Sequence, residues 1–396
     1  MSNLNKTAAN LIALLLGGTM AIVLGEGLLR IFFGANEPFC MYEPNISLER
    51  ELSDGERQGC PQGLRYSTNQ QGMRGDDYPD GASSYRILAM GGSTTICTYL
   101  DDAKTWPALV QKKLEKTADG RAVWVGNIGA NGLTTRSHIL QMLYCVPQYR
   151  VEAMLLLVGI NDLVLRLWEH EKHDPNFMES PANRRALMQR IFSVMPDSMI
   201  HPAYKRFGFW KLARRTRAAL HSHHRRNQTI SDLMAWRQNR AQGHKITKSP
   251  DLTAALEEYV RNIANVVELA KQSNIRVITM TQPVLWHAGL PEENANLLFG
   301  FIGEPGLANG HAHYAVEILA ECMKLYNEKL LQLCGQLGVE CIDLAALLPQ
   351  NTEVFCDDCH FTELGAELVA DIVVEYFHKQ HPVQAALYVA QHAAGE

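Results

Sequence analysis

Charged residues are missing from a long stretch near the start of the 396-residue chain. Residues 8–25 read AANLIALLLGGTMAIVLG and contain no Asp, Glu, Lys or Arg. A surface element of a globular domain is therefore excluded for this stretch. The apolar character resumes after Glu26 as GLLRIFFG, so 8–33 is longer than the roughly 20 residues that cross a hydrocarbon core. The sequence therefore predicts an N-terminal membrane anchor over 1–34. A cleaved secretory signal is the alternative, but the length of the stretch and the charged Glu26 and Arg30 in its distal end favour an uncleaved helix.

The sequence has few Cys or His residues at the spacings typical of metal sites. Cys356 and Cys359 have the Cys-x-x-Cys spacing of metal or redox sites, but no second Cys pair and no His pair at ligand spacing lies near them in the sequence. We therefore expect structural or disulfide cysteines here, no metal and no other cofactor. The nine cysteines of the chain are an odd number, so at least one thiol is free or pairs between chains. Cys40 and Cys60 could pair in an oxidising compartment.

Acidic residues are nearly absent from a second segment, 204–248. It holds twelve Lys and Arg against Asp232 alone, a charge of +11 in a chain whose formal net charge is −5. The aromatic residues interleaved with these cations are Phe207, Phe209, Trp210 and Trp236. This composition favours an amphipathic helix on an anionic surface or a lid over an anionic polymer, with a solvated helical face as the alternative and nucleic acid not expected. His221, His223 and His224 have no acidic or Cys partner beside them and are expected to be exposed side chains rather than metal ligands.

Apolar runs that indicate buried strands alternate with helical patterns from residue 85 onward. Strands are expected at 85–90, 122–127, 152–158, 275–281 and 338–343. Helices are expected at 103–118, 134–146, 253–273, 312–336 and 362–378. This alternation predicts an α/β fold with three layers, α/β/α, around a five-stranded parallel doubly wound sheet.

The same pattern sets the expected domain boundaries. Residues 35–84, rich in Pro, Gly and charge, are expected to form a linker and lead-in. The α/β domain is expected at 85–380 and a C-terminal tail at 381–396. Within the domain, a basic helical insertion at 166–252 separates the third strand from the next helix and is far longer than an ordinary connection.

Short motifs of glycine and polar residues follow the first three expected strands and precede the last helix. They are Gly91-Gly92-Ser93-Thr94, Asn131-Gly132, Gly159-Ile160-Asn161-Asp162 and Asp357-Asp358-Cys359-His360. Each alone is ordinarily a turn, a helix cap or a polar surface group. Because open α/β sheets collect functional groups at the carboxyl ends of their strands, the ordered set is expected to meet at one place. It supplies a nucleophile, oxyanion donors and an Asp/His pair, which acyl transfer by a serine enzyme requires.

The ordered set resembles the SGNH (GDSL) hydrolase superfamily over roughly residues 85–165 and 275–378, which implies a flavodoxin-like sheet. In that family the nucleophilic Ser follows the first strand in a Gly-Asp-Ser motif, and the present sequence departs from it because Gly92 replaces the Asp before Ser93. That Asp is not part of the triad, so Ser93 is still expected to be the nucleophile.

The other family positions carry over to the remaining motifs. The resemblance implies that the oxyanion Gly is Gly132, with Gly129 as the competing glycine, and that the oxyanion Asn is Asn161. It also implies that the closing Asp-x-x-His is Asp357 and His360. The neighbouring Asp358 is the alternative to Asp357.

These residue types suffice for ester chemistry. His360 is expected to take the proton of Ser93 as general base and to return it to the leaving alcohol, while Asp357 orients the imidazole. The backbone N–H groups of Ser93 and Gly132 and the side-chain amide of Asn161 are expected to bind the oxyanion.

The expected function is a serine ester hydrolase that removes a short acyl group, such as acetyl, from a cell-surface glycan or lipid. An O-acyltransferase that uses the same triad on an exported polysaccharide is the alternative, and a catalytically silent membrane-tethered binding protein is the third hypothesis. Anchored members of the family commonly carry the catalytic domain outside the cytoplasm. The resemblance therefore implies a single-pass inner-membrane protein, held through 8–33, with a periplasmic catalytic domain.

Two further segments have expected roles. Tyr66-Ser67-Thr68-Asn69 and Gly72-Met73-Arg74-Gly75 resemble the lead-in of membrane-anchored relatives, which runs alongside the catalytic domain; a plain surface loop is the alternative. The loop 283–311 is rich in Pro, Gly and aromatic residues and is expected to line the cleft. Its residues His287 and His311 either contact substrate or pack within the loop.

Overall fold

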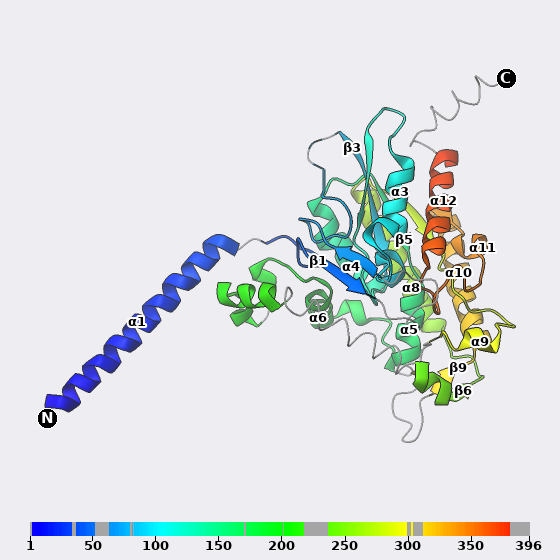
Figure 1. Cartoon of the computed structure of the whole chain (residues 1–396). Helices are drawn as coiled ribbons and strands as arrows, with labels where there is room; N and C mark the ends of the chain where they lie inside the picture. The colour runs from blue at the N-terminus through cyan, green and yellow to red at the C-terminus, as the bar shows by residue number, and fades with distance from the viewer. Residues whose placement is uncertain are drawn as a thin grey trace.

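The computed structural model describes most of the chain between residues 2 and 380 (Figure 1). The described residues are 2–33, 37–51, 63–79, 81, 83–169, 172–200, 202–217, 237–298, 302–303 and 312–380. Predictions that fall outside them concern Cys60, His221, His223, His224, Trp236, His311 and the tail 381–396.

The centre of the molecule is a sheet of five parallel strands. In chain order they are β3 (Ser84–Gly91), β4 (Ala122–Asn127), β5 (Ala153–Leu157), β7 (Arg276–Met280) and β10 (Glu340–Ile342). Their spatial order is β4-β3-β5-β7-β10, so the sequence order reverses between β3 and β5, as in flavodoxin-like sheets. Every residue of β3 and β5 is buried, as expected for parallel strands covered on both faces. The predicted α/β fold is confirmed.

Helices cover both faces of this sheet (Figure 1). One group pairs α3 (Trp106–Leu114) with α12 (Glu363–Gln380), and the other packs α8 (Thr253–Gln272) against α4 (Thr135–Leu140) and α10 (Val316–Leu337). Because crossovers between parallel strands are right-handed, the reversal of strand order puts the two groups on opposite faces. The three predicted layers are therefore present.

Two predicted helices differ from the observed ones. The helix expected at 134–146 changes to a π turn at Gln141–Cys145, and it ends near Pro147, which lacks the N–H that an α-helix needs. The helix expected at 312–336 begins later, because Ala312–Tyr314 pairs as a strand instead.

Two small sheets lie outside the central one and were not predicted. The first is the antiparallel pair β1 (Ser47–Glu51) and β2 (Gly63–Ser67), within the expected linker and lead-in. The second joins β6 (His244–Ile246), β9 (Ala312–Tyr314) and β8 (Ile302–Gly303). The shorter helices include α2 (Ser93–Ile96), α5 (Ile160–Glu169), α6 (Pro181–Ile191), α9 (Glu292–Ala295) and α11 (Leu344–Leu347). Two further helical stretches lie at 208–217 and 237–242.

The lead-in is tied to the core by Arg74, which is 1% exposed. Its guanidinium donates to the carbonyl oxygens of Ile96 (2.6 Å) and Cys97 (2.7 Å), and also to the carbonyl of Leu100. Its Nε lies 2.7 Å from Asp102 Oδ1. Carbonyls at the end of a helix have no partner within that helix, so Arg74 satisfies the end of α2, the helix that starts at the predicted nucleophile.

The N-terminal helix α1 (Ser2–Phe33) projects away from the rest of the molecule (Figure 1). Its segment Lys6–Phe32 has a mean hydropathy of 2.0 in its most apolar window, and none of that window is buried. The chain therefore has one N-terminal helix long and apolar enough to cross a membrane.

Candidate active site

The turn that carries Ser93 is built by glycines after β3. A Cβ at Gly91 would lie 2.5 Å from the carbonyl oxygen of Leu157 on the neighbouring strand, so only glycine fits there. The N–H groups of Thr95 and Ile96 then donate to the carbonyl of Gly92, both at 3.1 Å. This tight turn starts α2 at Ser93, at the point where the strand order reverses.

Asn161 lies directly against this turn. A Cβ at Gly92 would overlap with Asn161 Nδ2, so the amide of Asn161 occupies the space where the family's Asp side chain begins. The same Nδ2 donates to the carbonyl of Leu133 at 2.9 Å, one residue beyond Gly132. The structure thus brings together the three loops that follow β3, β4 and β5, as predicted.

The two candidate oxyanion glycines have different surroundings. The N–H of Gly129 already donates to Asn127 Oδ1 at 3.0 Å, and Asn127 Nδ2 donates to the carbonyl of Thr95 at 2.8 Å. Gly132 is exposed, with a left-handed φ of 72° and open space where a Cβ would lie. These contacts favour Gly132.

Asp357 and His360 form a buried pair in a turn before α12. His360 Nδ1 lies 2.8 Å and 2.9 Å from the two carboxylate oxygens of Asp357, and the His360 N–H also donates to Oδ1 at 2.9 Å. Asp357 is fully buried and His360 is 7% exposed. The carboxylate therefore fixes the ring through Nδ1 and directs Nε2 away from itself.

Contacts connect this pair to the Ser93 turn. The ring of Tyr99, six residues after Ser93, meets the His360 ring edge-on at 4.9 Å between centroids. The segment after β7 contacts both motifs, since Gln282 lies 3.5 Å from Thr94 Oγ1 and the N–H of Leu285 donates to the carbonyl of Asp358 at 2.9 Å.

Asp358 points elsewhere. Its Oδ1 accepts a hydrogen bond of 2.8 Å from Trp286 Nε1, which anchors the segment after β7. Among the described residues, one His/Cys/Asp/Glu group could also hold a metal ion, with ligand atoms of Asp357, Cys359 and His360 within 4.8 Å of one another. That group uses only one cysteine of the Cys-x-x-Cys pair, and Asp357 already bonds the ring of His360.

A cavity of about 420 Å³ opens beside Gly132 and Asn161. Its walls come from α5, α6 and the start of α4, and they include Trp168, Phe177 and Arg190. The Trp168 side chain is 57% exposed there. The cavity thus combines two expected oxyanion residues with a large exposed aromatic ring.

Two residues that line this cavity, Arg136 and Glu169, belong to an ionic cluster that the sequence did not reveal. Arg136 Nε lies 2.6 Å from Glu258 Oε1, and His173 bridges Glu258 (3.0 Å) and Glu169 (3.1 Å). Burial alone would raise the pKa of Glu258, but hydrogen bonds from His173 and Arg136 outweigh it and hold the pKa below its usual range. The shift favours the charged form of Glu258, which pairs with Arg136 beside the site.

Asp162 positions a neighbouring loop. Its carboxylate accepts hydrogen bonds from the N–H (3.0 Å) and the hydroxyl (2.6 Å) of Thr135 at the start of α4. Burial raises the pKa of Asp162 to about 7, and the hydrogen bonds from Thr135 oppose that shift. The residue next to Asn161 thus holds the loop of Gly132 in place.

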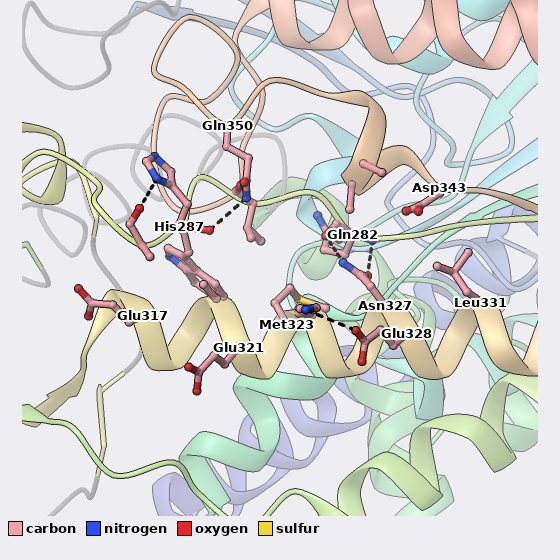
Figure 2. A pocket seen from close by; sticks show the side chains of 17 residues that line it. Gln282, His287, Glu317, Glu321, Met323, Asn327, Glu328, Leu331, Asp343 and Gln350 are labelled. Atoms are coloured by element: carbon pink, nitrogen blue, oxygen red, sulfur yellow. Dashed lines mark hydrogen bonds and ion pairs between the residues drawn. The ribbon is translucent and has the colours of Figure 1, made fainter.

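A larger cavity, of about 580 Å³, lies elsewhere (Figure 2). Its floor is α10, with Glu317, Glu321 and Asn327, and its roof carries His287 and Gln350. None of the predicted catalytic or oxyanion residues lines it. Gly132 and Asn161, two of the expected oxyanion residues, line the smaller cavity instead, and His287 lines a separate hollow.

Gly92→Ala is expected to lower ester hydrolysis by about 10²–10³-fold, the usual effect of losing one oxyanion donor, with the fold retained. The new methyl would push the Asn161 side chain aside, and that side chain can move. The measurement is kcat on a chromogenic ester. Because both changes act on one donor, Gly92→Ala should add little in an Asn161→Ala background. Fully additive losses would contradict this account.

Comparison with known proteins identifies one matching family. Residues 89–368 match the GDSL-like Lipase/Acylhydrolase family. The comparison with curated proteins found no match.

Solved structures that match this chain include a putative lipolytic protein of the G-D-S-L family from Desulfitobacterium hafniense, with 11% identity and a TM-score of 0.39 over 74% of this chain and 99% of that one. Another is Axe2, an acetylxylan esterase from Geobacillus stearothermophilus, with 14% identity and a TM-score of 0.39 over 74% and 93% of the two chains. The family match extends over most of the chain, from within β3 into α12. This chain therefore belongs to the GDSL-like lipase/acylhydrolase family and is an ester hydrolase of the serine type.

Proposed function

We propose that this chain is a membrane-anchored serine esterase that removes a short acyl group, such as acetyl, from a cell-surface glycan or lipid. Ser93 is the nucleophile, His360 the general base and acid, and Asp357 the group that orients the imidazole. The observation that carries this proposal is the pair of contacts from Asp357 to His360 Nδ1, at 2.8 Å and 2.9 Å. They leave Nε2 as the ring nitrogen that takes the serine proton.

The reaction follows the usual two steps of acyl transfer. Ser93 Oγ attacks the acyl carbon while His360 Nε2 takes its proton, and the same proton then goes to the leaving alcohol. A water molecule, deprotonated by His360, releases the acid and restores the serine. The N–H groups of Ser93 and Gly132 and the amide of Asn161 stabilise the oxyanion in both steps.

The cavity beside Gly132 and Asn161 supports a carbohydrate as the alcohol part of the substrate. Trp168 presents a flat apolar ring with a polar N–H, which suits the mixed apolar and polar surface of a sugar. Arg190 and Glu169 at the same cavity supply hydrogen-bonding groups around it. The substrate sugar would lie over Trp168 with its acetyl group at Ser93.

The location proposed for this activity is the inner membrane, with the catalytic domain in the periplasm. Helix α1 supports the anchor by its length and its exposed apolar surface. The side of the membrane follows from the resemblance to anchored relatives. An anionic surface or polymer at 204–248 is a further proposed partner.

The substrate class can be tested with the full-length enzyme in detergent. We expect p-nitrophenyl acetate to be cleaved faster than the octanoate ester. Trp168→Ala should raise KM for an acetylated oligosaccharide about tenfold, which corresponds to about 1.4 kcal/mol, and leave the small acetate ester unaffected. Leu325→Ala removes a similarly exposed apolar side chain on α10 and serves as the control.

The outcomes separate the alternatives. Equal losses on both acetate substrates would contradict sugar recognition by Trp168, and a preference for octanoate would contradict a short acyl group. Adding an unacetylated oligosaccharide tests the acyltransferase alternative. Acetylated acceptor, formed at the expense of free acetate, would show that the acyl-enzyme prefers an alcohol to water.

A further inference from the structure

Part of the basic insertion is attached to the distal end of α1. Glu26 accepts hydrogen bonds from the N–H groups of Gly208 (2.9 Å) and Phe209 (3.2 Å). These donors open the helix at 208–217, whose first N–H groups lack partners within it. Arg30 Nε lies 2.8 Å from the same carboxylate, and a Cβ at Gly208 would overlap with Leu29. In Figure 1 this part of the chain, in green, lies beside the end of α1.

The contact lies at the position along α1 where the helix is expected to leave the hydrocarbon core of the membrane. The uncharged residues 8–25 rise about 27 Å as a helix, close to the roughly 30 Å of a hydrocarbon core. Glu26 is the first charged residue after them. If 8–25 fills the core, the contact with Gly208 and Phe209 lies among the lipid headgroups.

The segment 203–217, here called the foot, exposes large apolar side chains at this level. The exposed fractions are 52% for Tyr204, 47% for Phe207, 44% for Phe209, 42% for Trp210 and 43% for Leu212. Tyr and Trp favour the interface between lipid and water, where the ring is apolar and its polar atom stays wet. The exposed apolar side chains of the foot therefore lie next to the apolar surface of α1 and extend it.

Three of the six cations of the foot pair with carboxylates of the protein instead. Lys211 is 2% exposed and lies 3.2 Å from Glu37 and 2.9 Å from Asp197. Arg214 lies 2.6 Å from Glu43, and Arg215 lies 3.2 Å from Glu37. Because these three cations are neutralised by carboxylates of the same protein, they contribute little to the attraction of the foot toward anionic lipid.

Two of the acidic partners, Glu37 and Glu43, belong to a segment that is fixed on the catalytic domain. Between Glu37 and Glu43, the N–H of Phe39 donates to Gln148 Oε1 at 2.9 Å and the N–H of Cys40 donates to the carbonyl of Val194 at 3.0 Å. The foot is thus bonded to the anchor on one side and to the catalytic domain on the other.

We propose that the foot lies in the headgroup layer of the bilayer that α1 crosses and inserts Phe207, Phe209 and Trp210 among the lipids. It thereby holds the catalytic domain in one orientation above the membrane. Insertion depends on the aromatic side chains and not on the internally paired cations Lys211, Arg214 and Arg215. This inference rests on the proposed anchoring by α1, but not on the esterase activity.

The test uses the full-length protein reconstituted into phosphatidylcholine vesicles with or without brominated acyl chains, which quench nearby tryptophan fluorescence. We expect Trp210→Phe to remove at least half of the quenched emission. Trp168→Phe, which removes an exposed tryptophan at the active-site cavity, should leave the quenched emission unchanged. Unaltered quenching in Trp210→Phe would overturn the proposal, and so would quenching of Trp210 that appears only when anionic lipid is added.

Two further measurements separate this proposal from the proposed anchor and from the proposed esterase activity. They are extraction with alkaline carbonate and the acetate-ester assay. Protein that stays in the membrane while Trp210 is not quenched contradicts the foot alone. Protein released by carbonate contradicts the anchor, and the foot with it. Trp210 that is quenched in an enzyme inactive on every ester supports the foot and contradicts the proposed function.

Discussion

Ser93→Ala is expected to abolish covalent labelling by a fluorophosphonate and to lower ester hydrolysis by several orders of magnitude, because no other group replaces the attacking oxygen. Some acceleration over water remains in such variants, since the oxyanion donors and the binding cavity are intact. The measurement is gel fluorescence of the labelled protein together with kcat on p-nitrophenyl acetate.

The neighbouring hydroxyl provides a matched control. Thr94 is 2% exposed, and its Oγ1 makes only a long contact of 3.5 Å with Gln282. Thr94→Val keeps the size of the side chain and should retain both labelling and turnover. Labelling that persists in Ser93→Ala and disappears in Thr94→Val would reverse the assignment of the nucleophile.

Asp357→Asn is expected to lower kcat by roughly 10⁴-fold, as the same change does in other Ser-His-Asp enzymes. The carboxylate contacts His360 through both oxygens, and an amide in its place would favour the wrong tautomer of the imidazole. The reaction with a fluorophosphonate should slow as well, because it needs the same base.

Asp358→Asn is the matched control for that experiment. Its Oδ1 accepts a hydrogen bond from Trp286 Nε1, and an asparagine oxygen can accept the same bond. We therefore expect less than a tenfold change in kcat, with the fold retained. A large loss in Asp358→Asn with little loss in Asp357→Asn would identify Asp358 as the orienting carboxylate.

The sequence predicted the sheet well because parallel strands are buried on both faces. The runs at 85–90, 122–127 and 152–158 agree with β3, β4 and β5 to within one residue at each end, since a continuous apolar run is the signature of such strands. The pattern was less precise at 338–343, where only Glu340–Ile342 pairs with β7. Short edge strands carry too few residues to mark their own limits.

Contacts between residues that lie far apart in the chain could not be predicted from the sequence. Arg136 and Glu258 are 122 positions apart, and nothing local links them, although a glutamate on the buried face of an amphipathic helix was a usable signal. The closeness of Gly92 to Asn161 likewise depends on how two loops meet. The motifs predicted that the loops after β3, β4 and β5 gather, whereas the three-dimensional packing determines that the N–H of Gly129 is already bonded to Asn127.

Arg74 has a consequence for how the protein can be divided. The family match begins at residue 89 and the central sheet at Ser84, so either position looks like a natural place to cut the chain. A fragment cut there would lack the Arg74 guanidinium, which donates hydrogen bonds to the carbonyls of Ile96 and Cys97. The turn that carries Ser93 would then lose these stabilising contacts. The smallest piece able to fold with an ordered Ser93 therefore begins well upstream of the region shared with its relatives.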